Sequence, residues 1–393
     1  MKSTDWHLIT SEYPPQTGGV SDYTQLVATG LASAGDEVHV WCPPANNGAT
    51  SARSVEATNA AGVFVHRELG RFAPADLRRT GSMLDQCRAP RRLLVQWVPH
   101  GYGYQSMNLP FCMWLLHRAA RRGDMVEIMV HEPYLSFGEG SWKQSGVAAI
   151  HRLMTMVLLK SARRVLVSIP AWEESLRPYT FGRALKFQWL PVASNIAVVD
   201  DYEGIRATRA LYAPAGERMV GHFGTYERHI TELLHKSVPP LLLGQSGCVL
   251  LLLGHGGEAV RDQLIEKHAE LAGRVHATGT LDATALSRHI SACDVLIQPF
   301  VDGVSSRRTS VMVGLSHGVP IITTSGRLTE PLWAESEAVA LVGVEDVRAL
   351  VDATHRLLTD AAMRTRMSVA ARALYQERFD VRRTITTLRE VAA

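Results

Sequence analysis

Apolar and polar residues follow two rhythms along the chain, short β-branched runs and longer stretches with helical spacing. The short runs predict strands and the longer stretches predict helices. In the first half, strands are expected at Trp6–Thr10, Glu37–Trp41, Val63–Val65, Leu93–Trp97, Glu127–Val130, Arg164–Val167 and Phe187–Leu190. The same rhythm restarts in the second half, at Met219–Phe223, Cys248–Leu253, Val275–Thr278, Val295–Gln298, Ile321–Thr323 and Ala338–Leu341.

Helical patterns lie between these strands. They are expected at Tyr23–Ala34, Pro110–Arg122, Ser145–Ser161, Ala171–Leu176, Glu258–Leu271, Leu281–Ser291 and Ser310–His317. Strands that alternate with helices predict parallel sheets covered on both faces. The pattern therefore predicts an α/β protein with two Rossmann-like, doubly wound domains.

The length supports two domains, because 393 residues exceed what one ordinary core accommodates. We expect a first domain over 1–195 and a second over 196–375, with the seam in the weakly patterned stretch near Ser194 to Glu217. Residues 376–393 predict a final helix that crosses back to the first domain.

Composition excludes several classes of protein. The chain is 46% hydrophobic and 20% charged, as in globular proteins, and its net charge of +3 does not argue for a nucleic-acid partner. The apolar run Val249–Leu253 is far shorter than the roughly 18 residues of a membrane span. No signal-peptide pattern opens the chain, and five cysteines lack paired spacing, so we expect a cytoplasmic protein with reduced thiols.

The segment Glu12 to Asp22 is the most informative one for chemistry. It follows the first predicted strand, contains Gly18-Gly19, and leads into the first predicted helix. Glycines allow close approach of a ligand to the backbone, and a helix N-terminus attracts anions. The segment therefore predicts a site for a phosphate or carboxylate, although a plain strand–helix turn is the simpler alternative.

Ligands of open α/β sheets bind beyond the carboxyl ends of the strands. The segments at those positions are Gly18–Val20, Pro99–Tyr104, His131–Tyr134, Gly221–Tyr226, Gly254–Gly257, Thr278–Leu281 and Pro299–Ser310. We expect them to lie at the edges of two domains that face each other across a cleft. Tyr102, Tyr104 and Trp97 are candidates for stacking on a sugar, with a place in the core as the alternative.

The ordered series of these segments resembles the retaining family-4 glycosyltransferases, which have the GT-B fold. The resemblance rests on Glu12-Tyr-Pro-Pro, Gly18-Gly-Val-Ser-Asp-Tyr, Gly221–Tyr226 and Thr278-Gly-Thr-Leu, and on Ala292–Phe300 and Leu315-Ser-His-Gly-Val-Pro-Ile-Ile. It covers nearly the whole chain. It implies a nucleotide-diphosphate sugar bound mainly by the second domain, and an acceptor bound by the first.

The resemblance also implies site residues. His131, Asp302 and Gly19 would form the catalytic group, with His131 contacting the donor sugar. The leaving phosphate would itself serve as the base. Protein groups would neutralise the leaving diphosphate, so no metal and no cofactor are expected. Residues expected to bind the nucleotide-sugar are Gly18, Gly19, Gly224, Thr225, Arg228, His255, Thr280, Leu281, Gly303, Val304, Ser305, Ser306, Arg307, Arg308, Thr309 and Ser310.

The chain departs from the family pattern in two respects. Only Arg228 stands near the place of the family's Arg and Lys after the first strand of the second domain, and the pair of glutamates also differs. The family carries two glutamates eight positions apart, whereas here Asp302-Gly303 resembles the first and Ser310 or Val313 takes the second position, depending on the direction of counting. We infer that diphosphate recognition has moved to Arg307 and Arg308, for which a solvated surface pair is the alternative. Glu330 either faces the cleft or begins a helix.

These observations predict a hexosyltransferase that uses a UDP-sugar and a saccharide or lipid-linked saccharide acceptor, in polysaccharide or glycolipid synthesis. The alternatives are GDP-mannose as donor and an inactive GT-B-like binding protein. The helical patterns Phe111–Arg122 and His151–Arg164 leave open a peripheral contact with the inner face of a membrane, against the simpler interpretation of packing on a sheet.

Overall fold

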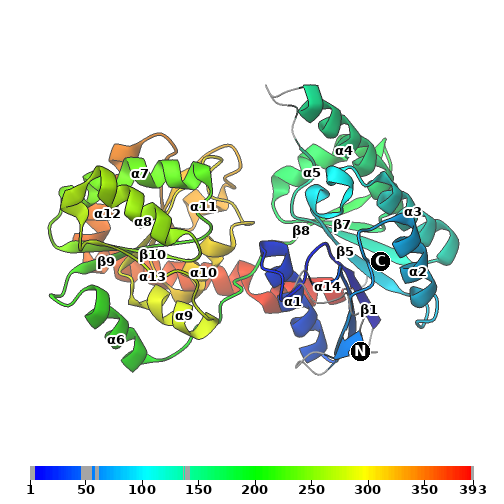
Figure 1. Cartoon of the computed structure of the whole chain (residues 1–393), viewed down its shortest axis with the longest axis horizontal. Helices are drawn as coiled ribbons and strands as arrows, with labels where there is room; N and C mark the ends of the chain where they lie inside the picture. The colour runs from blue at the N-terminus through cyan, green and yellow to red at the C-terminus, as the bar shows by residue number, and fades with distance from the viewer. Residues whose placement is uncertain (1–4, 46–54, 58–61, 136, 138–141, 391–393) are drawn as a thin grey trace. The chain divides into compact units, whose positions relative to one another are not determined.

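The computed structural model describes residues 5–45, 55–57, 62–135, 137 and 142–390. The chain forms two compact units (Figure 1). Unit 1 comprises Met1–Pro191 together with Val381–Ala393, and unit 2 comprises Val192–Asp380.

In its described residues, unit 1 contains one eight-stranded sheet with the spatial order β3-β4-β2-β1-β5-β6-β7-β8. Neighbouring strands are parallel, except that β3 runs antiparallel to β4. The order reverses between β1 and β5, which is the topological switch point of this sheet. The strands are β1 Asp5–Ile9, β2 Glu37–Trp41, β3 Val55–Ala57, β4 Val63–His66, β5 Arg92–Trp97, β6 Met125–Val130, β7 Arg164–Val167 and β8 Lys186–Trp189.

Helices cover both faces of this sheet. Alternate strand residues such as Ile9 and Val95 pack in one core cluster with Phe111 and Leu158 of the helices. On the other face Gly30 of α1 lies against Ile385 of α14, where a Cβ atom would be 2.7 Å from Ile385 Cδ1. The helices are α1 Gly19–Ser33, α2 Pro74–Leu84, η1 Pro99–Gly101, η2 Tyr104–Ser106, α3 Leu109–Arg122, α4 Trp142–Ser161, α5 Pro170–Leu176, η3 Arg177–Thr180 and α14 Val381–Arg389.

A buried ionic cluster fastens α14 to this sheet. The Glu127 carboxylate accepts hydrogen bonds from Arg92 at 2.9 Å and from Arg164 at 2.7 Å. Both guanidinium groups also donate to the carbonyl oxygen of Leu388, near the end of α14. Because terminal carbonyls of a helix lack partners within it, these arginines satisfy an otherwise orphaned acceptor, while Glu127 neutralises one of their two charges.

Unit 2, which is described throughout, contains a six-stranded parallel sheet with the order β11-β10-β9-β12-β13-β14. This is the order of the doubly wound nucleotide-binding fold, with its switch point between β9 and β12. The strands are β9 Arg218–Phe223, β10 Cys248–Leu253, β11 Val275–Ala277, β12 Val295–Gln298, β13 Ile321–Ser325 and β14 Val339–Gly343. The two sheets confirm the predicted α/β fold class.

The helices of unit 2 include one in the stretch that the sequence marks as weakly patterned. This helix, α6, begins where Asp201 accepts a hydrogen bond from the Gly204 N–H at 2.9 Å, and Arg209 ties it to Asp294 at 3.1 Å. The helices are α6 Tyr202–Tyr212, α7 Arg228–Leu243, α8 Gly257–Lys267, η4 Ala269–Leu271, α9 Ala283–Ala292, α10 Thr309–His317, α11 Leu332–Glu335, α12 Val347–Thr359, α13 Ala361–Leu374 and η5 Tyr375–Phe379. None of the described helices in either unit is long and apolar enough to span a membrane.

Candidate functional site

The switch point of unit 2 is held together by hydrogen bonds between the ends of two strands. The Gln298 side chain, at the end of β12, donates to the carbonyl oxygen of Phe223 at the end of β9, at 3.0 Å. One strand position earlier, His222 Nδ1 donates to the carbonyl oxygen of Ile297 at 2.8 Å. The loops that follow β9 and β12 therefore start from a fixed common edge.

The loop after β12 places two arginines around one aspartate. Arg307 pairs with one carboxylate oxygen of Asp302, and Arg308 pairs with the other. The Arg308 guanidinium also lies 4.4 Å from the ring centroid of Phe300, and burial together with the charge of Arg307 lowers its pKa. The structure thus brings the three charged residues of the predicted diphosphate site together. The carboxylate of Asp302 forms ion pairs with both guanidinium groups.

The N-terminus of α10 faces the same loop region. Arg308 occupies the N-cap position, and Thr309 and Ser310 are the first two residues of the helix. Their backbone N–H groups have no protein acceptor within the described part of the chain. Free N–H groups at a helix N-terminus attract anions, so this end of α10 and the two arginines combine into one positive site.

The residues between the aspartate and the arginines are turned inward. Val304, Ser305 and Ser306 are fully buried. The Glu330 carboxylate accepts hydrogen bonds from the Ser306 N–H at 2.9 Å and from the Ser306 hydroxyl at 2.5 Å, and from Trp333 Nε1 at 2.7 Å. Ser306 and Glu330 therefore hold this loop in place, and Glu330 is a buried anchor that precedes α11.

Gly303 is required by the same packing. Its φ is +84°, a conformation that favours glycine. A Cβ atom there would overlap Thr329 Oγ1 and the backbone of Gly326. The carbonyl oxygen of Asp302 also accepts a hydrogen bond from the Leu328 N–H at 2.9 Å. The loop after β13 therefore supports the loop after β12.

The loops after β9, β10 and β11 lie side by side at the same edge. Gly224 and Gly254 approach so closely that a Cβ on Gly254 would be 2.8 Å from the Gly224 carbonyl oxygen, and Gly254 bridges to Gly279. Of the other residues expected to bind the nucleotide-sugar on these loops, Leu281 is half-buried, and the exposed ones are Thr225, Arg228, His255 and Thr280. The Arg228 side chain pairs with Glu232 along α7 at 2.8 Å.

In unit 1, the helix after the Gly-Gly pair starts earlier than predicted. The expected start at Tyr23 is wrong, because α1 begins at Gly19. The Glu12 carboxylate accepts a hydrogen bond from the Ser21 N–H at 2.9 Å, which satisfies a donor in the first turn. Gly19 is exposed, and a Cβ atom there would meet nothing within 4 Å.

His131 follows β6 and is held by a side chain from β5. Its Nε2 lies 2.9 Å from Gln96 Oε1, which can only accept, so Nε2 carries the proton and Nδ1 is left as an acceptor. Its ring also makes an edge contact with Tyr23 at 5.0 Å between centroids. Burial lowers the pKa of His131 to about 4, so the imidazole is neutral at physiological pH.

The other ring candidates are divided by burial. Tyr102 and Trp97 are core residues, with 0% and 1% of their surface exposed, whereas Tyr104 is 48% exposed. His222 is buried, and His100 is exposed beside Glu132 at 3.7 Å. Within the described residues, no group of three or more His, Cys, Asp or Glu residues is arranged to hold a metal ion.

Comparisons with known proteins agree with this architecture. Residues 18–192 match the model of the glycosyl transferase 4-like domain, and residues 217–360 match that of the glycosyl transferases group 1. A sequence search finds no match among curated proteins.

Solved structures share the fold over the full chain. A sucrose-phosphate synthase from Thermosynechococcus elongatus has a TM-score of 0.75 at 18% identity, covering 98% of this chain and 97% of that one. HepE from Anabaena, in complex with UDP and glucose, gives 0.66 at 16%, covering 98% and 99%. An α,α-trehalose-phosphate synthase (UDP-forming) from Burkholderia xenovorans, in complex with glucose-6-phosphate, gives 0.69 at 12%, covering 98% and 99%.

The two sheets and the matched domains define a glycosyltransferase with the GT-B fold. The chain belongs to the family-4 type of these enzymes, as its motifs predict.

Proposed function

We propose that the protein transfers a hexose, with retention of anomeric configuration, from a nucleotide-diphosphate sugar to a saccharide or lipid-linked saccharide. A UDP-sugar is the favoured donor. The glycosyltransferase domains support the reaction class, and the proposal adds the donor, the stereochemistry and the independence of metal ions.

The observation that carries the proposal is the positive site after β12. Two guanidinium groups and two free N–H groups of α10 meet at the switch point of unit 2. Arginine binds diphosphate oxygens with bidentate geometry, and a helix N-terminus adds further donors. This set of donors suits a leaving diphosphate whose negative charge grows during transfer.

Asp302 takes part in this site as the group that a diphosphate replaces. Its two carboxylate oxygens pair with the two arginines. A bound diphosphate would take over these guanidinium groups and release the carboxylate toward the sugar, which is the role that the family resemblance gives to this position. The departing phosphate oxygen accepts the proton of the acceptor hydroxyl.

A neutral His131 fits hydrogen bonding to the donor sugar. Since Nε2–H is engaged by Gln96, Nδ1 would accept a hydrogen bond from a sugar hydroxyl. Gln96 is fully buried, so the ring has little freedom to turn. The histidine then contributes orientation rather than proton transfer.

The preference for uridine rests on the structural relatives, which bind UDP or form it.

Acceptor-free hydrolysis of a panel of UDP- and GDP-sugars, with and without EDTA, tests the proposal. We expect one UDP-sugar to be hydrolysed, at a rate that EDTA does not change. From an α-linked donor, NMR should show that the α-anomer of the sugar is released first. Turnover of GDP-mannose alone would overturn the donor, inversion would overturn the mechanism, and loss of activity with EDTA would overturn metal independence. The contact with a membrane and the setting in surface-polysaccharide synthesis stay predictions.

A further inference from the structure

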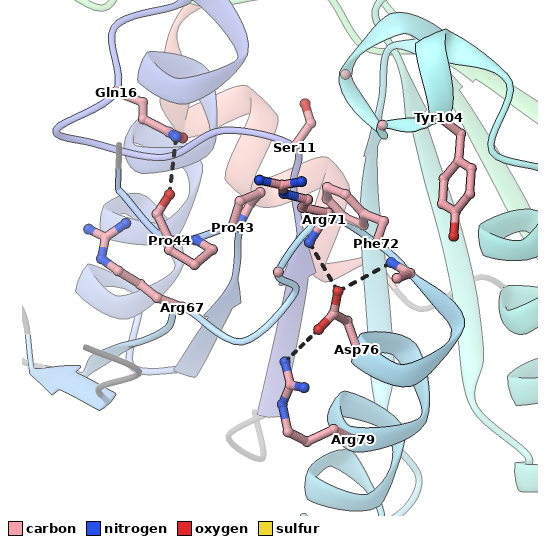
Figure 2. Close-up of a pocket in the computed structure, with 14 residues that line it drawn as sticks. Ser11, Gln16, Pro43, Pro44, Arg67, Arg71, Phe72, Asp76, Arg79 and Tyr104 are labelled. Carbon is pink, nitrogen blue, oxygen red and sulfur yellow. Dashed lines mark hydrogen bonds and ion pairs between the residues drawn. The ribbon is translucent and has the colours of Figure 1, made fainter. Parts of the chain in front are cut away.

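A pocket of about 850 Å³ opens at the carboxyl edge of the sheet in unit 1 (Figure 2). Its walls come from the segments that follow β1, β2, β4 and β5, which flank the switch point of that sheet. The volume lies within the range of small-molecule sites. None of the residues predicted from the sequence to bind the nucleotide-sugar lines this pocket.

The lining is rich in arginine. Arg67, Arg71 and Arg79 line the pocket together with one carboxylate, Asp76. Arg67 is buried and donates to the Pro14 carbonyl oxygen at 2.6 Å, which fixes its position in the wall.

The Asp76 carboxylate is already engaged within the pocket wall. It accepts hydrogen bonds from the N–H group of Arg71 at 3.1 Å and from Arg79 Nη2 at 3.0 Å (Figure 2). It also accepts one from the Ala73 N–H at 3.3 Å. Arg79 pairs in addition with Glu68 at 3.1 Å. These two carboxylates therefore balance Arg79, and Asp76 also caps the start of α2. The Arg71 guanidinium remains exposed, with no acceptor among the described residues.

Two glycines allow close packing around the backbone of Arg71. Gly70 has a φ of +53°, and a Cβ atom there would overlap the Asp76 carboxyl group. Gly103 has a φ of +74°, and its Cβ would lie 2.9 Å from the Arg71 carbonyl oxygen. Glycine at both positions lets the surrounding loops close on Arg71, so its side chain projects from a fixed base.

The opposite wall is conformationally strained. Tyr104, Gln105 and Ser106 all have positive φ values, of 50°, 51° and 74°. Left-handed conformations cost non-glycine residues about 1–2 kcal/mol each. His151 Nε2 holds the turn by donating to the Ser106 carbonyl oxygen at 2.8 Å. The turn leaves the Tyr104 ring half-exposed on the pocket, whereas the neighbouring Tyr102 is in the core.

We propose that this pocket binds the acceptor, and that the acceptor carries a phosphate or carboxylate which Arg71 recognises. The guanidinium forms paired hydrogen bonds with the anion, and the Tyr104 ring packs against the sugar. The acceptor role rests on the proposed function, whereas binding of an anionic sugar can be measured without it.

Calorimetric titration of the purified protein with a hexose 6-phosphate, a hexuronic acid and the parent hexose tests this inference. We expect at least one anionic sugar to bind, and the parent hexose to bind at least tenfold more weakly. Arg71→Glu should weaken the anionic sugar about ten- to a hundredfold, since a charged hydrogen bond is lost. Arg78→Glu is the matched control, because Arg78 lies on α2, is exposed and does not line the pocket.

Binding of the hexose 6-phosphate would identify phosphate as the recognised group, and binding of the hexuronic acid would identify carboxylate. Equal binding of the parent hexose, equal effects of the two charge reversals, or no binding of either anionic sugar at millimolar concentration would overturn the inference. Acceptor-free donor hydrolysis, measured in parallel, keeps the two proposals apart: intact hydrolysis without binding of anionic sugars contradicts only the pocket, and the reverse contradicts only the proposed function.

Discussion

The Glu12 carboxylate accepts a hydrogen bond from the backbone N–H of Ser21 at 2.9 Å, across the Gly-Gly turn of unit 1. The first turn of α1 is the feature that the sequence marks as a cradle for an external anion. In the structure, a side chain of the same loop already supplies a carboxylate to one of its donors. Gly18 is therefore required first for this internal contact.

The two glycines of this turn should respond differently to substitution. A Cβ at Gly18 would overlap the Glu12 carboxylate, whereas one at Gly19 would meet open space. We expect Gly18→Ala to lower the free energy of unfolding by about 1–3 kcal/mol, by displacing that carboxylate from its donor, and Gly19→Ala to leave it within about 1 kcal/mol. Urea denaturation measures both values.

A double mutant isolates the cause. In a Glu12→Ala background the obstacle is gone, so Gly18→Ala should cost much less there than in the natural protein. An equal cost in both backgrounds would show that the Glu12 contact is not the reason for glycine at this position.

Gly19→Val should slow sugar transfer more than it weakens nucleotide binding.

Glu330 should be essential to stability. Replacing it with Ala leaves the Ser306 N–H and the Trp333 Nε1 buried without their acceptor. Each buried unsatisfied donor costs about 1–3 kcal/mol, so we expect Glu330→Ala to destabilise by roughly 2–5 kcal/mol. Glu335→Ala, on the exposed side of α11, is the control. A loss below 1 kcal/mol in chemical denaturation would contradict the anchoring role.

Stability should fall in mild acid because of histidines whose pKa is lowered by desolvation, such as the half-buried His131. Its folded pKa is about 4, below the ordinary histidine value of 6.5, so between these pH values the unfolded chain binds a proton that the folded chain does not. Stability is then present above pH 6.5 and is lost as the pH falls toward 4, by at most about 3 kcal/mol for this group. His131→Gln should flatten this slope, and substitution of the exposed His229 should not. If the free energy of unfolding of His131→Gln depends on pH as strongly as that of the natural protein, the lowered pKa of His131 is contradicted.

The alternation of apolar runs was sufficient to predict both sheets, because buried parallel strands are continuous and β-branched. The edge strand β3 was missed since it has three residues, and α7 was missed because Pro239 and Pro240 lie inside it, where proline normally interrupts a helix. Helix α6 was overlooked because only one of its residues, Thr208, is buried, which leaves little apolar periodicity.

The residues of the candidate site were predicted from the sequence only where they belong to a local motif. Arg307 and Arg308 stand out in sequence, but their pairing with Asp302 depends on how the loop folds back. The pocket at Arg71 was missed although it follows a predicted strand, because Arg67 to Phe72 matches none of the motifs that carry the family resemblance. Glu330 lies 24 positions from Ser306, and no local pattern links a carboxylate to a partner so distant.

Asp302 should compete with the nucleotide for its arginines. Replacing it with Asn removes the negative charge that pairs with both guanidinium groups. We expect Asp302→Asn to tighten UDP binding by about 1 kcal/mol and to slow donor hydrolysis. Weaker UDP binding in this variant would show that the carboxylate supports the nucleotide rather than displacing it.

The central claim is that Arg307 and Arg308, with the N-terminus of α10, bind the diphosphate of the donor. Calorimetric titration of UDP into the natural protein, Arg308→Ala and the exposed control Arg348→Ala tests it most directly. The account predicts that Arg308→Ala loses about 1.5–3 kcal/mol of binding free energy and that Arg348→Ala loses none. Equal affinity of all three proteins for UDP would contradict it.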